Sequence, residues 1–151
     1  MFDLFIDFSV TLTGFSTFRL QGTGMAAPYF ETVQKIIGPA TLDELLLQYQ
    51  AIVATANGDA ATLDNLLRNT IFNDPKFGPV TRNIIKLWFV GTWYQLPKDW
   101  WGAYGTGEQG DSFVVSPAAY TEGLLWPTVG VTPAGAKAPG YDSWVNAPVF
   151  S

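Results

Sequence analysis

Two glycine-rich stretches have the spacing that cradles the phosphates of a dinucleotide. Residues 105–110 (GTGEQG) match G-x-G-x-x-G, and residues 22–27 (GTGMAA) match the variant G-x-G-x-x-A. This chemistry needs a preceding β-strand, a helix whose N-terminus faces the pyrophosphate, and a parallel sheet around both. The first stretch follows an aromatic segment and precedes no helical pattern, and the second follows only a weak strand pattern. We therefore interpret both as loops.

The acidic residues offer little acid–base chemistry. Asp3 with Asp7, and Asp43 with Glu44, are local pairs at expected helix starts, where the helix dipole favours negative charge. The chain contains no His and no Cys, which excludes thiolate or imidazole metal ligands and any Ser-His-Asp or Cys-His pair. Acid–base work would fall to Asp, Glu, Tyr or Lys. We predict no catalytic, cofactor-binding or metal-binding residue.

Composition indicates one folded domain. The 151 residues are 48% hydrophobic and 14% charged, which is typical of a globular chain. The net charge of −5 and the absence of a Lys/Arg cluster argue against nucleic-acid binding and against docking on an anionic membrane. The first eight residues carry two Asp and do not resemble a signal peptide. The longest apolar stretch, 84–96, is interrupted and too short to span a bilayer, so no transmembrane segment is expected.

The elements that would position any site are predicted to be mainly α-helical. Residues 1–97 are expected to form a compact bundle of five helices, the third starting with a capping box of Thr41 and Glu44. Apolar alternation at the start of the first helix also allows a strand. The predicted helices are Phe2–Thr13, Pro28–Ile37, a segment from Thr41 to Asn57, Ala60–Phe72, and a segment from Pro79 to a stop at Pro97.

Residues 98–151 differ in character from the bundle. They are rich in Gly and Pro, and only residues 118–125 give a helical pattern, so we predict a long, largely irregular C-terminal arm. Its rings could be buried by the arm folding back on the bundle, or by a partner, since Trp and Tyr dominate interface hot spots. We favour the partner. The predicted interface residues are Trp100, Trp101, Tyr104, Tyr120, Trp126, Tyr141 and Trp144.

Several patterns, in order along the chain, resemble one known family. The opening F-x-x-F-S-x-x-L-T-G, formed by Phe5, Phe8, Ser9, Leu12, Thr13 and Gly14, resembles the start of the small (gamma) subunits of membrane-bound FAD-dependent sorbitol, fructose and glucose dehydrogenases. The stretch Ile85-x-x-Trp88-Phe89-Val90-Gly91 resembles a helix of that family. Tyr120-x-x-x-Leu124-x-Trp126 and Pro139-Gly140-x-x-x-Trp144-x-x-x-Pro148 resemble its closing segment.

The resemblance implies a non-catalytic subunit of an oxidoreductase complex. In that family a large flavoprotein of the glucose–methanol–choline type holds FAD and oxidises the sugar or polyol, and a cytochrome c subunit commonly takes the electrons. The small subunit is similar to a folding and export companion, so a periplasmic, membrane-associated complex is expected. The sequence itself shows no twin-arginine signal.

Two other function classes stay open from the residues alone. A carbohydrate-binding module would stack sugars on Trp100, Trp101 and Trp144, and it would be mostly β-structure. A stand-alone dehydrogenase would carry a bound flavin or nicotinamide, and a visible absorption spectrum would reveal the flavin.

Overall fold

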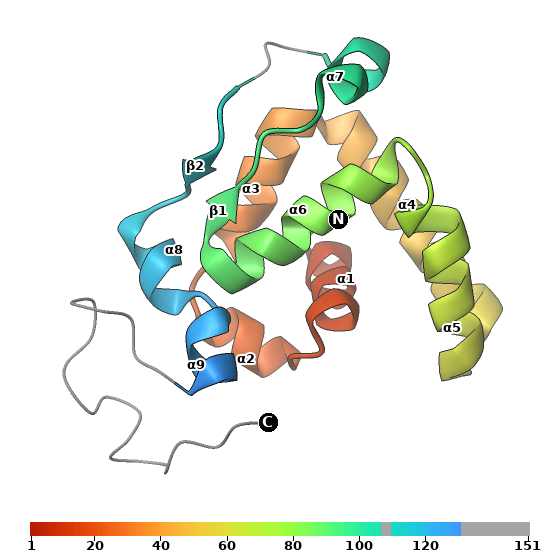
Figure 1. Cartoon of the computed structure of the whole chain (residues 1–151). Coiled ribbons are helices and arrows are strands. Elements are labelled where there is room, and N and C mark those ends of the chain that lie inside the picture. Colours follow the sequence, from red (N-terminus) through yellow and green to blue (C-terminus); the bar gives the residue numbers. More distant parts are fainter. Residues whose placement is uncertain (107–109, 131–151) are drawn as a thin grey trace.

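Helices dominate the chain. The computed structural model describes residues 1–106 and 110–130. Helix α1 lies against α3, α4 and α6 in the centre of the body (Figure 1). The prediction of a mainly α fold is confirmed. The elements are α1 (Phe2–Thr13), α2 (Thr17–Gly22), α3 (Ala26–Ile37), α4 (Pro39–Ala56), α5 (Ala60–Leu66), the π-helix η1 (Leu67–Phe72), α6 (Phe77–Val90), β1 (Thr92–Trp93), α7 (Lys98–Tyr104), β2 (Phe113–Val114), α8 (Pro117–Glu122) and α9 (Leu125–Val129).

The first helix has the predicted bounds. Its apolar residues recur at helical spacing, so Phe5, Ile6 and Phe8 are buried together against the body. Gly14 ends the helix in the left-handed conformation (φ 76°), and its backbone N–H donates to the carbonyl oxygen of Val10 at 2.9 Å. The strand alternative for this segment is therefore wrong.

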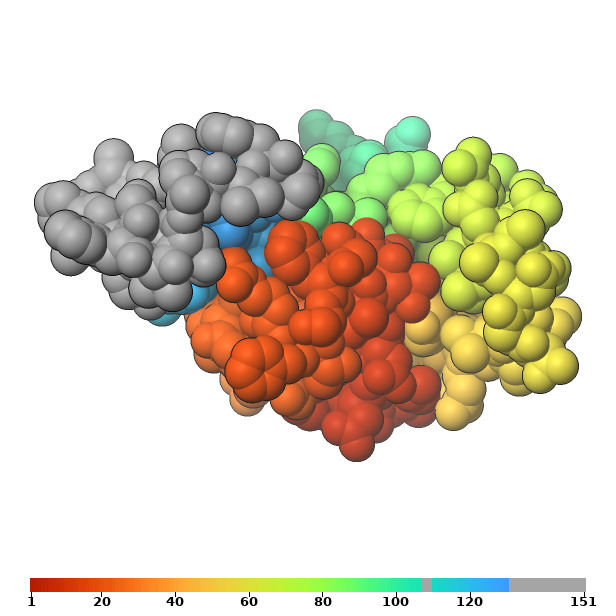
Figure 2. All heavy atoms as spheres, turned by 90° about the horizontal axis from the view of Figure 1, so that it is seen from below, coloured from red at the N-terminus to blue at the C-terminus, as the bar shows by residue number. Residues whose placement is uncertain are grey.

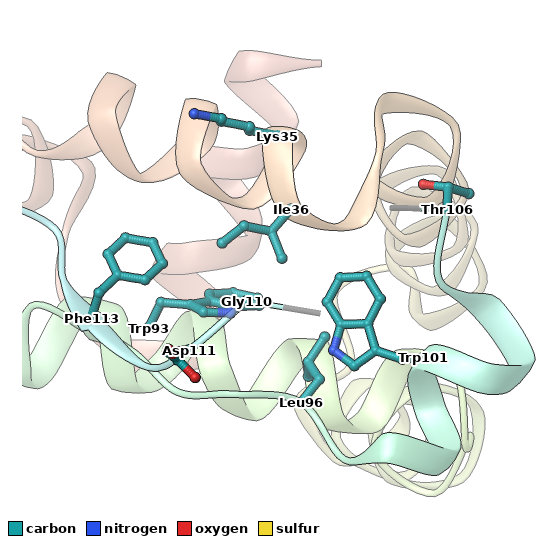
Figure 3. A pocket seen from close by; sticks show the side chains of 9 residues that line it. All are labelled: Lys35, Ile36, Trp93, Leu96, Trp101, Thr106, Gly110, Asp111 and Phe113. Atoms are coloured by element: carbon teal, nitrogen blue, oxygen red, sulfur yellow. The ribbon is translucent and has the colours of Figure 1, made fainter. Parts of the chain in front are cut away.

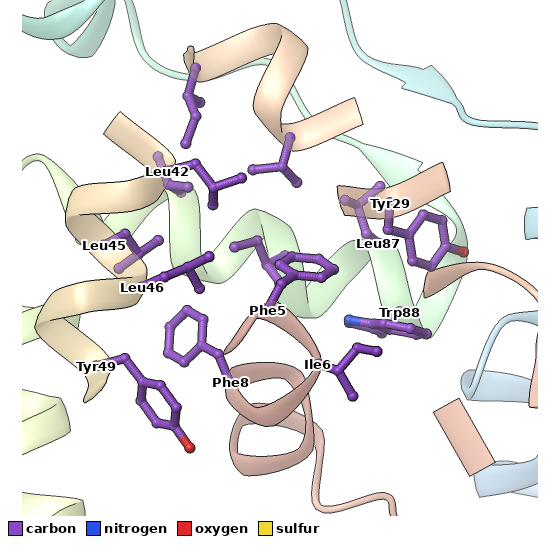
Figure 4. Close-up of a cluster of buried hydrophobic side chains, with 14 of the residues drawn as sticks. Phe5, Ile6, Phe8, Tyr29, Leu42, Leu45, Leu46, Tyr49, Leu87 and Trp88 are labelled. Atoms are coloured by element: carbon purple, nitrogen blue, oxygen red, sulfur yellow. The ribbon is translucent and has the colours of Figure 1, made fainter. Parts of the chain in front are cut away.

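The hydrophobic core forms where α1 meets α3, α4 and α6 (Figure 4). Tyr29 of α3 and Trp88 of α6 meet edge to face, with ring centroids 4.9 Å apart and an interplanar angle of 88°. Phe8 of α1 packs on Tyr49 of α4 at 4.8 Å, and Phe5 is fully buried. A large buried ring contributes on the order of 2–3 kcal/mol, so these contacts are a main source of stability.

Helix α4 begins before its predicted start. Gly38, with φ 89°, turns the chain directly after α3, and Pro39 then occupies the first turn, where its fixed φ suits a helix. Thr41 makes no capping hydrogen bond and is buried inside the helix. The carboxylate of Glu44 instead pairs with Nζ of Lys76 at 2.8 Å. The predicted capping box is therefore wrong.

The helix predicted over residues 60–72 consists of two consecutive segments, α5 and η1. The Asp59 side chain caps α5 by accepting from the backbone N–H of Thr62 at 3.3 Å. In η1 the turn widens to i→i+5, as in the hydrogen bond from Asn73 N–H to the carbonyl oxygen of Arg68 at 2.9 Å. The predicted end at Phe72 is correct, whereas the change of helix type leaves no signal in the apolar spacing.

Helix α6 ends at Gly91 and does not continue to Pro97 as predicted. Gly91 adopts the left-handed conformation (φ 67°), and its N–H donates to the carbonyl oxygen of Leu87 at 2.8 Å. Trp93 then belongs to β1 and pairs with Phe113 of the antiparallel strand β2. Trp93 is buried, so the apolar stripe continues in space after the helix has stopped.

The described part of the predicted arm folds back on the bundle. Residues 98–130 hold α7, α8 and α9, with α7 near one end of α6 and α8 and α9 near the other (Figure 1). Trp100, Ala119 and Leu124 enter the core. Residues 98–106 and 110–130 thus carry three short helices where the sequence predicted one, because helices of five to seven residues are too short to show periodicity. Within residues 1–106 and 110–130, no helix combines the length and hydropathy that crossing a membrane requires.

Candidate partner-binding surface

Trp100, predicted to lie on a partner, is buried by its own chain. The side chain is 3% exposed, and its Nε1 donates to the carbonyl oxygen of Lys76 at 2.8 Å. The ring meets Trp101 edge to face at 5.2 Å and Tyr104 at 5.8 Å. Helix α7 thus turns this ring toward the start of α6. The prediction of a partner-facing ring is wrong for Trp100, which has a structural role.

The other predicted rings of α7 keep part of their surface in solvent. Trp101 and Tyr104 are half-buried. Nε1 of Trp101 is buried without a hydrogen-bond partner, and Nζ of Lys76 lies 5.7 Å from the centre of the Tyr104 ring. The predicted interface residues Tyr141 and Trp144 lie outside the described residues.

Tyr120 and Trp126 form a pair at the joint of α8 and α9. Their rings are edge to face, with centroids 5.5 Å apart, and Nε1 of Trp126 donates to the backbone carbonyl oxygen of Tyr120 at 2.8 Å. Tyr120 is 40% exposed and Trp126 is half-buried. The structure therefore brings these two predicted interface residues together and leaves both partly exposed. They belong to α8 and α9, whereas the other described rings of the prediction belong to α7.

Exposed apolar side chains gather on the last described elements. Residues 112–130 contain a single charged residue, Glu122. Depletion of charge is typical of the core of a protein interface. Both views place α9 beside α2 (Figures 1 and 2). We give the name C-terminal apolar face to four exposed apolar side chains of β2, α8 and α9: Val114 (54% exposed), Tyr120 (40%), Leu125 (38%) and Val129 (41%).

The end of α6 holds the C-terminal apolar face in place. The backbone N–H of Leu124 donates to the carbonyl oxygen of Trp88 at 2.9 Å, and that of Val115 donates to the carbonyl oxygen of Gly91 at 3.0 Å. A Cβ at Gly91 would lie 2.5 Å from the carbonyl oxygen of Ala119. Sequence reasoning missed Ala119 and Leu124 as anchors; the absence of a side chain at Gly91 is the signal that could have found them.

The motif residues of α1 build the helix and its end. Oγ of Ser9, fully buried, donates to the carbonyl oxygen of Phe5 at 2.7 Å. Oγ1 of Thr13 donates to the carbonyl oxygen of Ser9 at 2.8 Å and accepts from the backbone N–H of Phe15 at 3.2 Å. Leu12 is half-buried against the core. These side chains shape the turn that leads to α2 and expose no reactive group.

The second motif, carried by α6, packs directly on the first. Helices α1 and α6 are in contact, and Phe5 and Trp88 belong to the same buried cluster. Trp88 is 1% exposed, and its Nε1 has no hydrogen-bond partner. Two patterns that lie far apart in the sequence thus meet in one packing unit, which Gly91 closes. The motif residues of α1 and α6 therefore have a role in packing the core.

The buried tyrosines of the body are structural. Burial raises the pKa of Tyr29 well above its ordinary value, and the carboxylate of Glu122 raises it further. Burial also raises the pKa of Tyr49, against the lowering effect of its hydrogen bond with Thr11 at 2.6 Å, while the charge of Asp7 adds to the rise. Both phenols therefore stay protonated at neutral pH and cannot serve as general bases.

Neither glycine-rich match has the surroundings of a nucleotide site. The match at 22–27 links α2 to α3, and the match that begins at residue 105 follows α7. The two strands in the described part of the chain are short and antiparallel, whereas the nucleotide site needs a parallel sheet. Residues 107–109 of the second match lie outside the described residues. Among residues 1–106 and 110–130, no three acidic side chains gather as metal ligands would.

A pocket of about 310 Å³ opens between α3, the segment from β1 to α7, and β2 (Figure 3). Its apolar wall combines the rings of Trp93, Trp101 and Phe113 with the side chains of Ile36 and Leu96. The rest of the lining is formed by Lys35, Thr106, Gly110 and Asp111, which supply polar groups. Of the predicted interface residues that the structure describes, Trp101 alone lies here. Sequence reasoning missed the others, since they come from three distant segments.

Comparison with known proteins leaves the family open. No protein-family model matches the chain, no curated protein is significantly similar to it, and no solved structure matches its fold. The likeness to the dehydrogenase small subunits rests on the sequence patterns, and the function that it implies stays a prediction.

Proposed function

We propose that this chain is a non-catalytic small subunit that binds and stabilises a large FAD-dependent sugar or polyol dehydrogenase. In this proposal the flavoprotein partner, of the glucose–methanol–choline type, holds FAD and the substrate pocket. A cytochrome c subunit completes the complex, which works at the periplasmic side of a membrane. The small subunit helps the flavoprotein to fold and to be exported.

The observation that carries the proposal is the C-terminal apolar face. Its four side chains are each between 38% and 54% exposed, and they stand on elements that the core fixes through Ala119 and Leu124. Full burial of such a side chain is worth about 1.5–3 kcal/mol, so covering the exposed parts of all four would contribute about 2–5 kcal/mol. A surface that is both apolar and rigid suits a permanent partner, because little entropy is lost on binding.

The sequence patterns supply the kind of partner. The residues that carry the resemblance, from Phe5 to Gly14 and from Trp88 to Gly91, converge in the packing unit that supports this face. A buried scaffold that presents an apolar surface suits an accessory subunit. The lack of His and Cys in the whole chain fits a division of labour in which the redox chemistry belongs to another polypeptide.

Co-expression tests the proposal. A large flavoprotein of the glucose–methanol–choline type from the same source is produced with and without this chain, and the yield of soluble protein with bound flavin is measured. We expect the yield to fall several-fold without the chain. An equal yield of active flavoprotein in both cases would refute the proposal.

A matched pair of variants locates the interface. Leu125→Asp places a charge on the C-terminal apolar face, whereas Leu47→Asp places the same charge on α4 at a similar exposure (38% against 48%). A charge buried without a partner at an interface costs several kcal/mol. We expect Leu125→Asp to abolish co-purification with the flavoprotein and Leu47→Asp to leave it intact. The reverse pattern would move the interface to α4.

A further inference from the structure

The pocket beside Trp101 combines aromatic faces with a few polar groups. Trp101 and Phe113 stand on opposite sides of it, with Trp93 and Ile36 between them (Figure 3). Trp93 is 2% exposed and is held by the core, whereas Phe113 is 42% exposed and offers its ring to a ligand. Pockets for small molecules are typically lined by such rings and by a small number of polar groups that fix the orientation.

The rings suit the apolar faces of a sugar. The face of an aromatic ring carries partial negative charge, and the C–H groups on one side of a sugar ring carry partial positive charge. A ligand in the pocket would meet the aromatic wall formed by Trp93, Trp101 and Phe113. The same ligand must bring hydroxyl groups, because the rim of the pocket is polar.

The polar groups favour a neutral ligand over a charged one. Lys35 supplies a cationic donor, Asp111 an anionic acceptor and Thr106 a hydroxyl that can do both. Because the two charges are opposite, a ligand of either sign would meet one like charge. Thr106 thus completes a rim in which donors and acceptors are both present, as the hydroxyl groups of a neutral ligand require.

The size of the pocket limits the ligand to one sugar unit. A volume of about 310 Å³ lies at the lower end of the range for small-molecule sites. We propose that this pocket binds a monosaccharide or a linear polyol, which packs on the aromatic wall beside Phe113 and turns its hydroxyl groups toward the polar rim that includes Asp111. This inference does not rest on the proposed function, because it concerns the chain without any partner.

Titration of the full chain tests the pocket. D-glucose, D-fructose and D-sorbitol are added separately to the isotope-labelled protein, and backbone amide shifts are followed by NMR. We expect saturable shifts confined to residues 35–36, 93–101 and 110–113, with a Kd on the order of 1 mM for so small a ligand. Absence of saturable binding by all three, or shifts that map elsewhere, would overturn the inference.

Variants and competing ligands sharpen the test. Phe113→Ala should weaken binding about three- to tenfold, since it removes one stacking ring, whereas Phe18→Ala removes an 87% exposed ring outside the pocket and should change nothing. Asp111→Asn on the exposed rim keeps the fold and should also weaken binding. Equal affinity in all three variants would overturn the inference, as would tighter binding of the zwitterion L-serine or the anion D-gluconate. Failure of co-expression would leave these results unaffected, so the two proposals can fail separately.

Discussion

Substitution of Gly91 by Ala isolates the contact that holds the C-terminal apolar face. The left-handed conformation of Gly91 (φ 67°) costs an alanine about 1–2 kcal/mol. The new Cβ would also lie 2.5 Å from the carbonyl oxygen of Ala119, a backbone atom that cannot turn away. Helix α8 must then shift. This weakens the burial of Leu124 and the backbone hydrogen bonds donated by Leu124 and Val115, which together contribute about 2–4 kcal/mol to stability. We expect a total loss of about 3–6 kcal/mol.

Gly14→Ala is the matched control. Gly14 has nearly the same conformation (φ 76°), but a Cβ there meets no atom within 4 Å. Its cost should therefore be the backbone term alone, about 1–2 kcal/mol. Because a chain of this length loses about 2–4 °C in Tm for each kcal/mol, the two variants should be clearly separated by thermal unfolding.

Urea unfolding and amide hydrogen exchange provide the assay. Gly91→Ala should lower the free energy of unfolding by at least about 2 kcal/mol more than Gly14→Ala does, and it should speed exchange at the N–H groups of Val115 and Leu124. Equal losses in the two variants, with unchanged exchange at these groups, would show that α8 is not anchored on Gly91 and would refute the reasoning.

Two further variants test local contacts. Trp100→Phe keeps a ring but removes the hydrogen bond from Nε1 to the carbonyl oxygen of Lys76, and it should lower the free energy of unfolding in urea by about 1–2 kcal/mol. Trp126→Phe, which removes an exposed hydrogen bond, should cost less. An equal cost in the two variants would contradict the structural role of Trp100. Asp59→Ala should lower Tm at neutral pH, because hydrogen bonds from Thr62 lower the pKa of Asp59 below its ordinary value of 3.8. The capping contribution is then fully present above pH 3.8 and is lost as the pH falls through the lower folded-state pKa, so a Tm difference from the unchanged protein that persists in acid would count against it.

The long helices could be predicted because their signals are local. Apolar residues at helical spacing mark α1, and Gly14 ends it at the predicted residue. The end of α6 was missed because Trp93 prolongs the apolar stripe, although Gly91 had already stopped the helix. Helix α2 was missed because six residues are too few to show a period.

The candidate surface was only partly predictable, because burial depends on distant segments. The aromatic content of residues 98–130 indicated an important surface, yet the sequence could not separate Trp100, which fills the core, from Tyr120, which stays exposed. The acceptor for Trp100 is a backbone carbonyl group at Lys76, and no pattern in the sequence reveals such a partner. The pocket likewise joins Ile36 to Phe113, and only the fold brings them together.

Hydrogen–deuterium exchange of the chain with and without the large flavoprotein used for co-expression tests the central claim most directly. If the C-terminal apolar face is the docking surface, amides in residues 113–130 should exchange more slowly in the mixture, while those of α4 and α5 keep their rates. Unchanged exchange across residues 113–130, or protection confined to α4 and α5, would contradict the claim.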